Sequence, residues 1–243
     1  VRVNPAKIQD PGAQLDLPID TEVRMEGRSR YGVVLAQRPT FTLDPLFHAG
    51  AYYVQEGSSM AIENRLPLYQ EVLRESADGK FRILDLCAAP GGKSTHLVSM
   101  FRDCPGAMVV SNEVIRSRAT ILAENMAKWG GANVVVTNND PADFKPFGSF
   151  FDMVVVDAPC SGEGMFRKDP ASRAEWSVEG VAQCAARQKR IVADIWSALR
   201  TGGVMIYSTC TYNSSENGEN LSWIASELGG EVLYSEQCFP GEK

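Results

Sequence analysis

The sequence lacks three features that would each point to a different class of protein. It has no apolar run of the roughly 18–20 residues that a membrane-spanning helix needs, and no signal-peptide pattern at its start, so we expect a soluble, cytoplasmic protein. Its closest cysteines, Cys87 and Cys104, are 17 positions apart, which excludes the closely spaced pairs of zinc and redox motifs. Its two histidines, His48 and His96, have no partner pattern, so we predict no metal and no catalytic role for either.

The chain also has little positive charge for a protein that binds nucleic acid, because its net charge is −6 at pH 7. Residues 211–243 hold six acidic residues and one lysine, so five of the six excess negative charges lie there. Residues 160–200 instead hold seven Lys or Arg against five Asp or Glu. Local surface charge governs binding to nucleic acid, so RNA and DNA stay among the candidate partners.

From about residue 81 onward, apolar runs alternate with amphipathic segments. The predicted strands cover residues 82–86, 108–111, 133–137, 153–156, 204–207 and 231–234. The predicted helices cover residues 94–101, 116–129, 183–199 and 215–228. Several strands are continuous apolar runs, as expected for strands that are buried on both faces. Repeated β-α units predict an α/β fold with a doubly wound, mostly parallel sheet.

The first part of the chain has a different pattern. Residues 1–45 contain two short predicted strands, 1–4 and 31–35, separated by Pro, Gly and Asp, and are too few for a confident core of their own. We therefore expect a partial α+β accessory domain over residues 1–45 and a catalytic domain over residues 46–243. Because the chain opens on Val1 and stops soon after a predicted strand, we expect it to be a fragment, truncated at its C-terminus.

The first strand of the catalytic part leads into a loop of small residues, 87–95, and then into a helix. Such a loop lets a ligand approach the backbone near a helix N-terminus. The Gly-Lys-Ser-Thr end of this loop resembles a phosphate-binding P-loop, and residues 153–157 resemble the acidic strand of an NTPase. A P-loop needs glycine where Cys87 stands, however, and Pro90 replaces the backbone that would wrap a phosphate. The sequence therefore disfavours an ATPase.

The alternative is a nucleoside cofactor, which requires an acidic residue after the second strand, about 20 residues beyond the glycines, to bind ribose hydroxyls. Glu113 lies 21 residues after Gly92 and directly follows the second strand. Asp140 follows the third strand, where it could meet an adenine edge or cap a helix, and Asp157 follows the fourth. Three acidic residues at one sheet edge beside a glycine loop favour S-adenosylmethionine.

Two cysteines end adjacent predicted strands at this same edge. Cys160 follows the fourth strand in the sequence Asp-Ala-Pro-Cys, and Cys210 follows the fifth in Ser-Thr-Cys. A single cysteine is most often a small buried hydrophobic residue, and we expect this of Cys104, Cys184 and Cys238. Cys160 and Cys210 differ, because strand-end loops line the ligand crevice of open α/β sheets.

These motifs together resemble the Sun/Nop/Fmu family of RNA 5-methylcytosine methyltransferases. The matching stretches are residues 2–5, 49–60, 85–95, 112–113 with Arg118, 157–162 and 207–211. Residues 161–170 are most similar to the F-type (YebU-like) branch of bacterial small-subunit ribosomal RNA enzymes. The resemblance implies a class I methyltransferase, Rossmann-like fold that acts on RNA, most of all 16S ribosomal RNA. Transfer RNA as the substrate and a non-catalytic RNA-binding assembly factor are the alternatives.

The resemblance also implies roles for individual residues. Cys210 is expected to add to carbon 6 of cytosine, Cys160 to assist release of the product, and Asp157 to bind the cytosine edge with its carboxylate held ionised by Lys93. The residues expected to bind S-adenosylmethionine are Cys87, Ala88, Ala89, Pro90, Gly91, Gly92, Lys93, Glu113, Arg118, Asp140 and Asp157. Arg167 and Lys168 are expected to contact RNA, whereas Arg173, Arg187, Lys189 and Arg190 are expected to form a solvated surface. No membrane and no protein partner are indicated.

Overall fold

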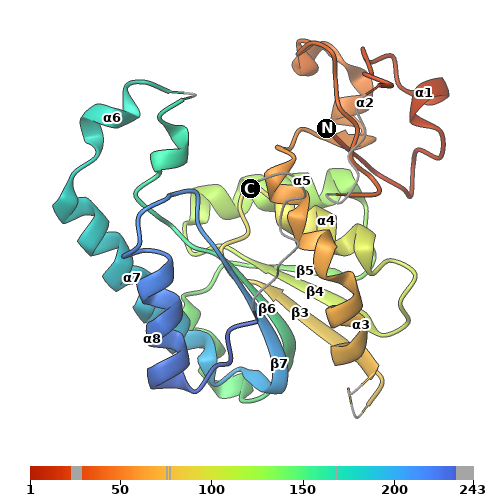
Figure 1. Cartoon of the computed structure of the whole chain (residues 1–243). Coiled ribbons are helices and arrows are strands. Elements are labelled where there is room, and N and C mark those ends of the chain that lie inside the picture. The colour runs from red at the N-terminus through yellow and green to blue at the C-terminus, as the bar shows by residue number, and fades with distance from the viewer. Residues whose placement is uncertain (23–28, 75, 77, 168, 234–243) are drawn as a thin grey trace.

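A sheet of five parallel strands forms the centre of the computed structural model, which describes residues 1–22, 29–74, 76, 78–167 and 169–233 (Figure 1). The strands are β3 (Phe81–Asp85), β4 (Ala107–Asn112), β5 (Val134–Thr137), β6 (Phe151–Asp157) and β7 (Leu199–Ser208). Their spatial order is β5-β4-β3-β6-β7, so the chain winds outward from β3, returns, and winds outward again from β6. This confirms the doubly wound parallel sheet and places a topological switch point between β3 and β6.

Helices cover both faces of the sheet (Figure 1). One face carries α3 (Leu66–Arg74), α4 (Gly92–Met100) and α5 (Arg116–Trp129), and the other carries η3 (Pro141–Phe147), α7 (Val178–Trp196) and α8 (Gly218–Leu228). Successive strand residues alternate between the two apolar clusters: Ile83 packs in the first and Leu84 in the second. Of the helices in the described ranges, none combines the length and the apolar character needed to cross a membrane.

The sequence placed several boundaries wrongly. Helix α7 begins at Val178 rather than at residue 183, because the Ser177 side chain accepts from the Gly180 N–H and caps it there. Strand β7 begins at Leu199 and runs through Gly202 and Gly203, which the sequence suggested as a break. Helix α8 begins at Gly218 rather than at residue 215. Residues 231–233 are not in a strand, and the last residue of that predicted strand, Tyr234, lies outside the described residues.

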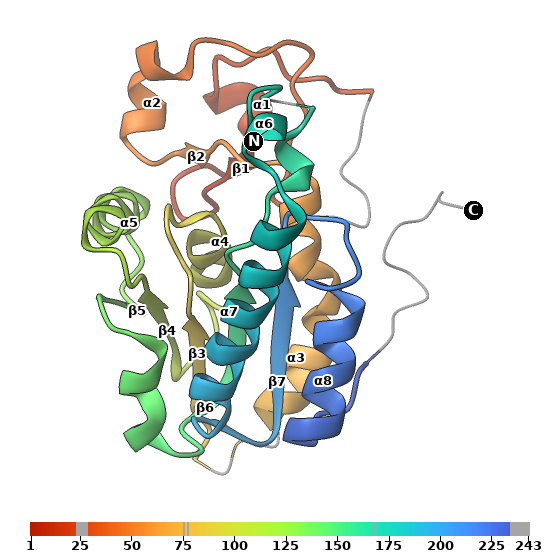
Figure 2. The same cartoon turned by 90° about the vertical axis from the view of Figure 1, so that its left-hand side faces the viewer.

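The described residues before α3 form short elements around a two-stranded ribbon, in which β1 (Arg2–Val3) pairs antiparallel with β2 (Tyr52–Tyr53). The remaining short elements here are α1 (Pro11–Gln14), η1 (Phe41–Leu43), α2 (Pro45–His48) and η2 (Ser58–Arg65). The predicted strand 31–35 is reduced to isolated bridges at Gly32 and Leu35. Figure 2 shows this part lying beyond the end of the sheet toward which the strands point. The division of the chain after residue 45 stays a prediction.

The N-terminal part is attached to the end of α5 by close contacts with the α5 backbone. The Asn4 side-chain amide donates to the carbonyl oxygens of Gly50 and Trp129, each at 2.9 Å. Gly50 has a φ of +67°, and a Cβ there would lie 2.1 Å from the Lys128 carbonyl oxygen. A side chain at position 50 would therefore meet both backbone strain and a rigid collision.

We expect Gly50→Ala to lower the free energy of unfolding by about 3 kcal/mol, from a left-handed alanine and the collision together. Gly79→Ala is the matched control, because Gly79 has the same φ of +67° and nothing within 4 Å of its Cβ position. It should cost only about 1 kcal/mol. Urea unfolding of both variants measures the difference, and equal losses would show that the contact with Lys128 has no importance.

Candidate active site

Those predicted site residues that follow β3, β4, β6 and β7 share one edge of the sheet. Parallel register places Asp85 of β3 opposite Val155, two residues before the end of β6, and pairs Asp157 with Ser208. The loops that follow these strands therefore start at one edge of the sheet, in the crevice where open α/β folds bind ligands.

The two strand-end cysteines contact each other. Cys160 Sγ lies 3.1 Å from Cys210 Sγ, and the Cys210 N–H also donates to Cys160 Sγ at 3.3 Å. Cys210 is exposed, whereas Cys160 is half-buried. The contact with the Cys160 sulfur lowers the pKa of Cys210 to about 7, and the nearby Lys93 charge acts in the same direction. The same contact, together with burial, raises the pKa of Cys160. Of the two thiols, Cys210 is therefore the one that ionises first.

A charged pair lies beside these sulfurs. The Lys93 ammonium, at the start of α4, is 2.7 Å from Asp157 Oδ2 at the end of β6. The other carboxylate oxygen of Asp157 accepts a hydrogen bond from the Ser208 hydroxyl at 2.8 Å. The two contacts hold the half-exposed Asp157 carboxylate in one orientation.

Glu216 joins the two cysteine loops and was missed by the sequence reasoning, which counted it only as part of an acidic tail. Its carboxylate is fully buried and accepts from the Ser161 N–H at 2.9 Å, Gln188 Nε2 at 2.8 Å and Asn213 Nδ2 at 2.8 Å. Ser161 follows Cys160, Asn213 follows Cys210 by three residues, and Gln188 comes from α7. No ion pair to Glu216 occurs within the described ranges, so hydrogen bonds alone compensate its burial.

Glu163, in η4 (Glu163–Met165), forms a second link between the loops. Its carboxylate accepts from the backbone N–H groups of Tyr212 at 2.8 Å and Asn213 at 3.0 Å. The neighbouring Gly164 N–H donates to the Cys210 carbonyl oxygen at 2.8 Å. The signal for both glutamates was in the sequence: each stands among Ser, Thr, Asn and Gly residues, which supply donors for a carboxylate.

Several backbone groups of the loop after β3 are paired within the protein. The Ala88 N–H donates to the Asn112 carbonyl oxygen at 2.8 Å, and the Gly91 N–H donates to the Ala88 carbonyl oxygen at 2.7 Å. The side chains of Arg118 and Asn125 donate to the carbonyl oxygens of Ala89 and Pro90. These contacts hold the loop in one conformation against β4 and α5.

Two buried carboxyl groups face this loop. Asp85 accepts from the Ser94 hydroxyl at 2.6 Å through Oδ2, while its buried Oδ1 has no partner among the described residues. Burial raises the pKa of Asp85 to about 6. Glu113 is also buried, and its Oε2 lies 3.5 Å from Arg118. Burial raises the pKa of Cys87 to about 12, so this thiol stays protonated.

The other residues predicted for the site are Asp140, Arg167 and Lys168. Asp140 caps η3 by accepting from the Ala142 N–H, the alternative that the sequence left open. Arg167 is exposed, and Lys168 lies outside the described residues. Three other cations make intramolecular contacts: Arg173 with the Phe166 ring, Lys189 with the Trp223 ring, and Arg190 with Asp140. No cluster of three or more His, Cys, Asp or Glu that could hold a metal occurs in the described ranges.

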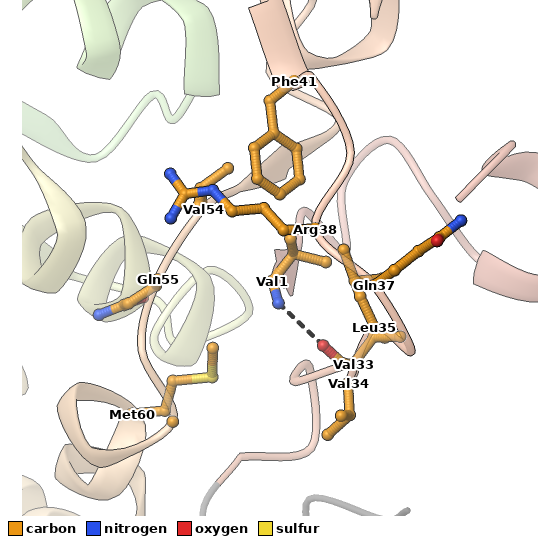
Figure 3. Close-up of a pocket in the computed structure, with 11 residues that line it drawn as sticks. Val1, Val33, Val34, Leu35, Gln37, Arg38, Phe41, Val54, Gln55 and Met60 are labelled. Atoms are coloured by element: carbon orange, nitrogen blue, oxygen red, sulfur yellow. Dashed lines mark hydrogen bonds between the residues drawn. The ribbon is translucent and has the colours of Figure 1, made fainter. Parts of the chain in front are cut away.

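Arg2 connects the N-terminal ribbon to the loop and was also not foreseen as a site residue. Its fully buried guanidinium lies 4.6 Å from the centre of the Trp129 ring and donates to the Gly92 carbonyl oxygen at 3.1 Å. Its Nε donates to Gln55 Oε1 at 2.8 Å. Gln55 in turn lines a cavity of about 290 Å³, whose other lining residues include Arg38 and Phe41 (Figure 3). None of the predicted catalytic residues lines this cavity.

The reactivity of Cys210 should depend on the thiol of Cys160. In the wild-type chain, the rate of Cys210 alkylation by iodoacetamide should rise through about pH 7, because only the thiolate reacts. In Cys160→Ala the hydrogen bond is lost, so we expect the midpoint to move up toward the ordinary value of about 8.5. Peptide mass spectrometry over a pH series measures it, with Cys104→Ala as the control that should leave it unchanged. An unchanged midpoint in Cys160→Ala would contradict the assignment.

We expect Glu216→Gln to disturb the cysteine pair. The new amide would place an N–H group where a carboxylate oxygen now accepts from the Ser161 N–H and the Gln188 side chain, so these two donors would lose their acceptor. The predicted loss is about 2 kcal/mol of the free energy of unfolding, with a rise in the midpoint of Cys210 alkylation. Glu219→Gln is the matched control, since the exposed Glu219 carboxylate accepts, among the described residues, only from the Ser214 and Ser215 hydroxyls. Normal alkylation in Glu216→Gln would show that Glu216 does not position the sulfurs.

Comparison with known proteins identifies a family and relatives whose sequences are similar to this chain. The sequence model of a family described as 16S rRNA methyltransferase RsmB/F matches residues 72–233. A relative from Pectobacterium carotovorum, named ribosomal RNA small subunit methyltransferase F, is 39% identical over 74% of this chain. The chain spans only 36% of that relative's length.

Solved structures agree with the fold. A methyltransferase homologue from Pyrococcus horikoshii superposes with a TM-score of 0.73 at 26% identity, over 93% of this chain and 68% of that one. NSun6 from the same organism, solved with SFG, superposes with a TM-score of 0.61 at 26% identity, over 77% and 45%. The fold is therefore the Rossmann-like fold of class I methyltransferases. Since the family model covers well over half of the chain, this chain belongs to the RsmB/F family of 16S rRNA methyltransferases.

Proposed function

We propose that this chain transfers a methyl group from S-adenosylmethionine to carbon 5 of a cytidine in RNA, with 16S ribosomal RNA as the favoured substrate. The observation that carries the proposal is the contact of 3.1 Å between the exposed Cys210 sulfur and the half-buried Cys160 sulfur, which lowers the pKa of Cys210 and raises that of Cys160. The family description and the name of the Pectobacterium relative support ribosomal RNA.

The residues at the end of β3 and β4 fit the cofactor. S-adenosylmethionine supplies a methyl group on a positively charged sulfur, which is the electrophile of the reaction. Asp85 Oδ1 is a buried acceptor with no partner among the described residues, which suits an amino acid ammonium group. Glu113 is a buried carboxylate at the end of the second sheet strand in sequence, the place that binds ribose hydroxyls in this fold class. The SFG in the NSun6 structure, an analogue of S-adenosylmethionine, supports this assignment.

Cys210 provides the nucleophile. Carbon 5 of cytosine is too weak a nucleophile to accept a methyl group unaided, so the Cys210 thiolate first forms a bond to carbon 6 and makes carbon 5 electron-rich. After the methyl group joins carbon 5, a base removes the proton from that carbon. The electron pair re-forms the double bond between carbons 5 and 6, and the bond from Cys210 to carbon 6 breaks.

Cys160 is suited to assist that last step because its acidity depends on the state of Cys210. In the free enzyme, the hydrogen bond to Cys210 raises the pKa of Cys160 and keeps it a thiol. Once Cys210 is a thioether, its negative charge is gone and this cause of the shift disappears. The pKa of Cys160 then falls toward its ordinary value at the stage when a proton must leave carbon 5. Release of the methylated cytosine is therefore coupled to the earlier formation of the bond between Cys210 and carbon 6.

Asp157 and Lys93 orient the base. We assign Asp157 to the cytosine edge that carries N3 and the amino group, where its carboxylate accepts from the amino group. Lys93 and Ser208 hold that carboxylate from two sides. The Lys93 charge also favours the Cys210 thiolate, so one lysine serves both the nucleophile and the residue that orients the base. Arg167 is proposed to contact RNA phosphates, as is Lys168.

Covalent trapping tests the proposal. The chain is mixed with S-adenosylmethionine and RNA containing 5-fluorocytidine, whose fluorine cannot leave as a proton, so the adduct should survive denaturation. Mass spectrometry should map it to Cys210, and Cys210→Ala should abolish it. Cys160→Ala should retain the adduct and accumulate it on unmodified cytidine as well.

Two outcomes would contradict the proposal. An adduct on Cys160 would show that the roles of the two cysteines are exchanged. If 16S ribosomal RNA, transfer RNA and short single-stranded RNA all gave no adduct although S-adenosylmethionine bound normally, carbon 5 chemistry would have to be abandoned.

A further inference from the structure

Exposed apolar side chains lie beside the loop that carries Cys210. Met165, Trp176 and Tyr212 are joined to that loop through Glu163 and Gly164, and we name these three residues the loop surface. Tyr212 is two residues beyond Cys210, and 83% of its side chain is exposed. Its ring stacks on no other aromatic ring and its hydroxyl makes no hydrogen bond within the described ranges. A large side chain so exposed beside a reactive thiolate suggests a binding surface.

The loop surface is held rigidly although it is exposed. The Tyr212 N–H and the Trp176 indole N–H donate to the two oxygens of one carboxylate, that of Glu163, at 2.8 and 3.2 Å. The Gly164 N–H donates to the Cys210 carbonyl oxygen, and a Cβ at Gly164 would lie 2.7 Å from that oxygen. The backbone under Met165 and Tyr212 is therefore fixed relative to the Cys210 sulfur before any ligand arrives. Preorganisation of this kind lowers the entropy cost of binding.

From this arrangement we propose that the loop surface stacks against the nucleotides that flank the target cytidine in single-stranded RNA, with Tyr212 as the principal contact. The inference rests on the proposed RNA methylation and names how the RNA is held there. A cytosine must leave its stack for its carbon 6 to reach Cys210, which leaves the faces of its neighbours uncovered. An exposed aromatic ring beside the nucleophile replaces the lost stacking partner.

RNA fits the loop surface better than a protein partner does. Tyr212 is exposed only two residues from Cys210, so RNA that delivers a base to that sulfur comes close to its ring. The exposed Arg167 and Arg173 lie in the same segment as Met165 and Trp176, and Arg173 lies 5.9 Å from the Phe166 ring centre. Guanidinium groups beside apolar rings suit a backbone of phosphates with stacked bases.

Fluorescence anisotropy with a labelled single-stranded RNA containing one cytidine tests the inference on the full chain. We expect Tyr212→Ala to weaken binding about tenfold, and Tyr212→Phe, which keeps the ring, to bind within about twofold of wild type. Phe147→Ala is the matched control, because Phe147 is an exposed aromatic residue before β6, at the opposite sheet edge. Thermal unfolding of each variant separates loss of binding from loss of fold.

A crosslinking measurement locates the contact directly. RNA with 5-fluorocytidine at the target and 5-iodouridine beside it is trapped on the protein and irradiated. We expect the crosslinked peptide to contain Tyr212 or Trp176.

The outcomes separate the two proposals. If the wild-type chain forms the adduct on Cys210, but Tyr212→Ala binds RNA normally and crosslinks map elsewhere, the loop surface does not bind RNA and a protein partner becomes its explanation. If no adduct forms although RNA binding falls in Tyr212→Ala, the inference stands and the carbon 5 chemistry fails.

Discussion

The parallel pairing of β6 with β7 is the constraint on which the site depends. Register places Asp157 beside Ser208, so the two chain segments leave the sheet as neighbours. Cys160 lies three residues beyond the end of β6, and Cys210 lies two residues beyond the end of β7. The sulfurs meet at 3.1 Å because both loops turn toward the same side after leaving adjacent strands. A slip of the register would separate them, since successive residues of a strand face opposite sides.

Two carboxylates, the buried Glu216 and the half-buried Glu163, hold these loops in place through hydrogen bonds. Glu216 is enclosed by donors from α7 and from both loops, and Glu163 accepts from two consecutive backbone N–H groups beyond Cys210. Burial of a carboxylate costs free energy that its hydrogen bonds offset. Each lost hydrogen bond leaves part of that cost uncompensated, so the geometry around the carboxylate tolerates few changes. Such a network fixes the distance between two sulfurs more tightly than apolar packing alone would. It also leaves both cysteines facing the crevice.

The N-terminal ribbon contributes to the cofactor edge from outside the sheet. Arg2, in β1, donates to the Gly92 carbonyl oxygen at the start of α4. It also packs over the Trp129 ring at the end of α5. Burial lowers the pKa of Arg2 to about 9, a sign of how completely this cation has left water. The loop after β3 is thus held by its contacts with Asn112 and with Arg2. These contacts explain how a loop of small residues keeps one conformation.

The sequence by itself determined the sheet class, the glycine loop and the residues that end each strand, because these follow from the period of apolar residues and from local turn chemistry. It also identified Cys160, Cys210, Asp157 and Glu113 as candidates, since strand ends of a parallel sheet share one edge. Only the tertiary structure decided that Glu216 belongs to the site, although the composition assigned it to an acidic tail. Only the tertiary structure showed that Arg2 is buried against Gly92 and Trp129 and that the Cys160 and Cys210 sulfurs are in contact. Hydrogen bonds between residues 50 or 90 positions apart carry no signature in local periodicity, so the fold has to bring their partners together before they can be recognised.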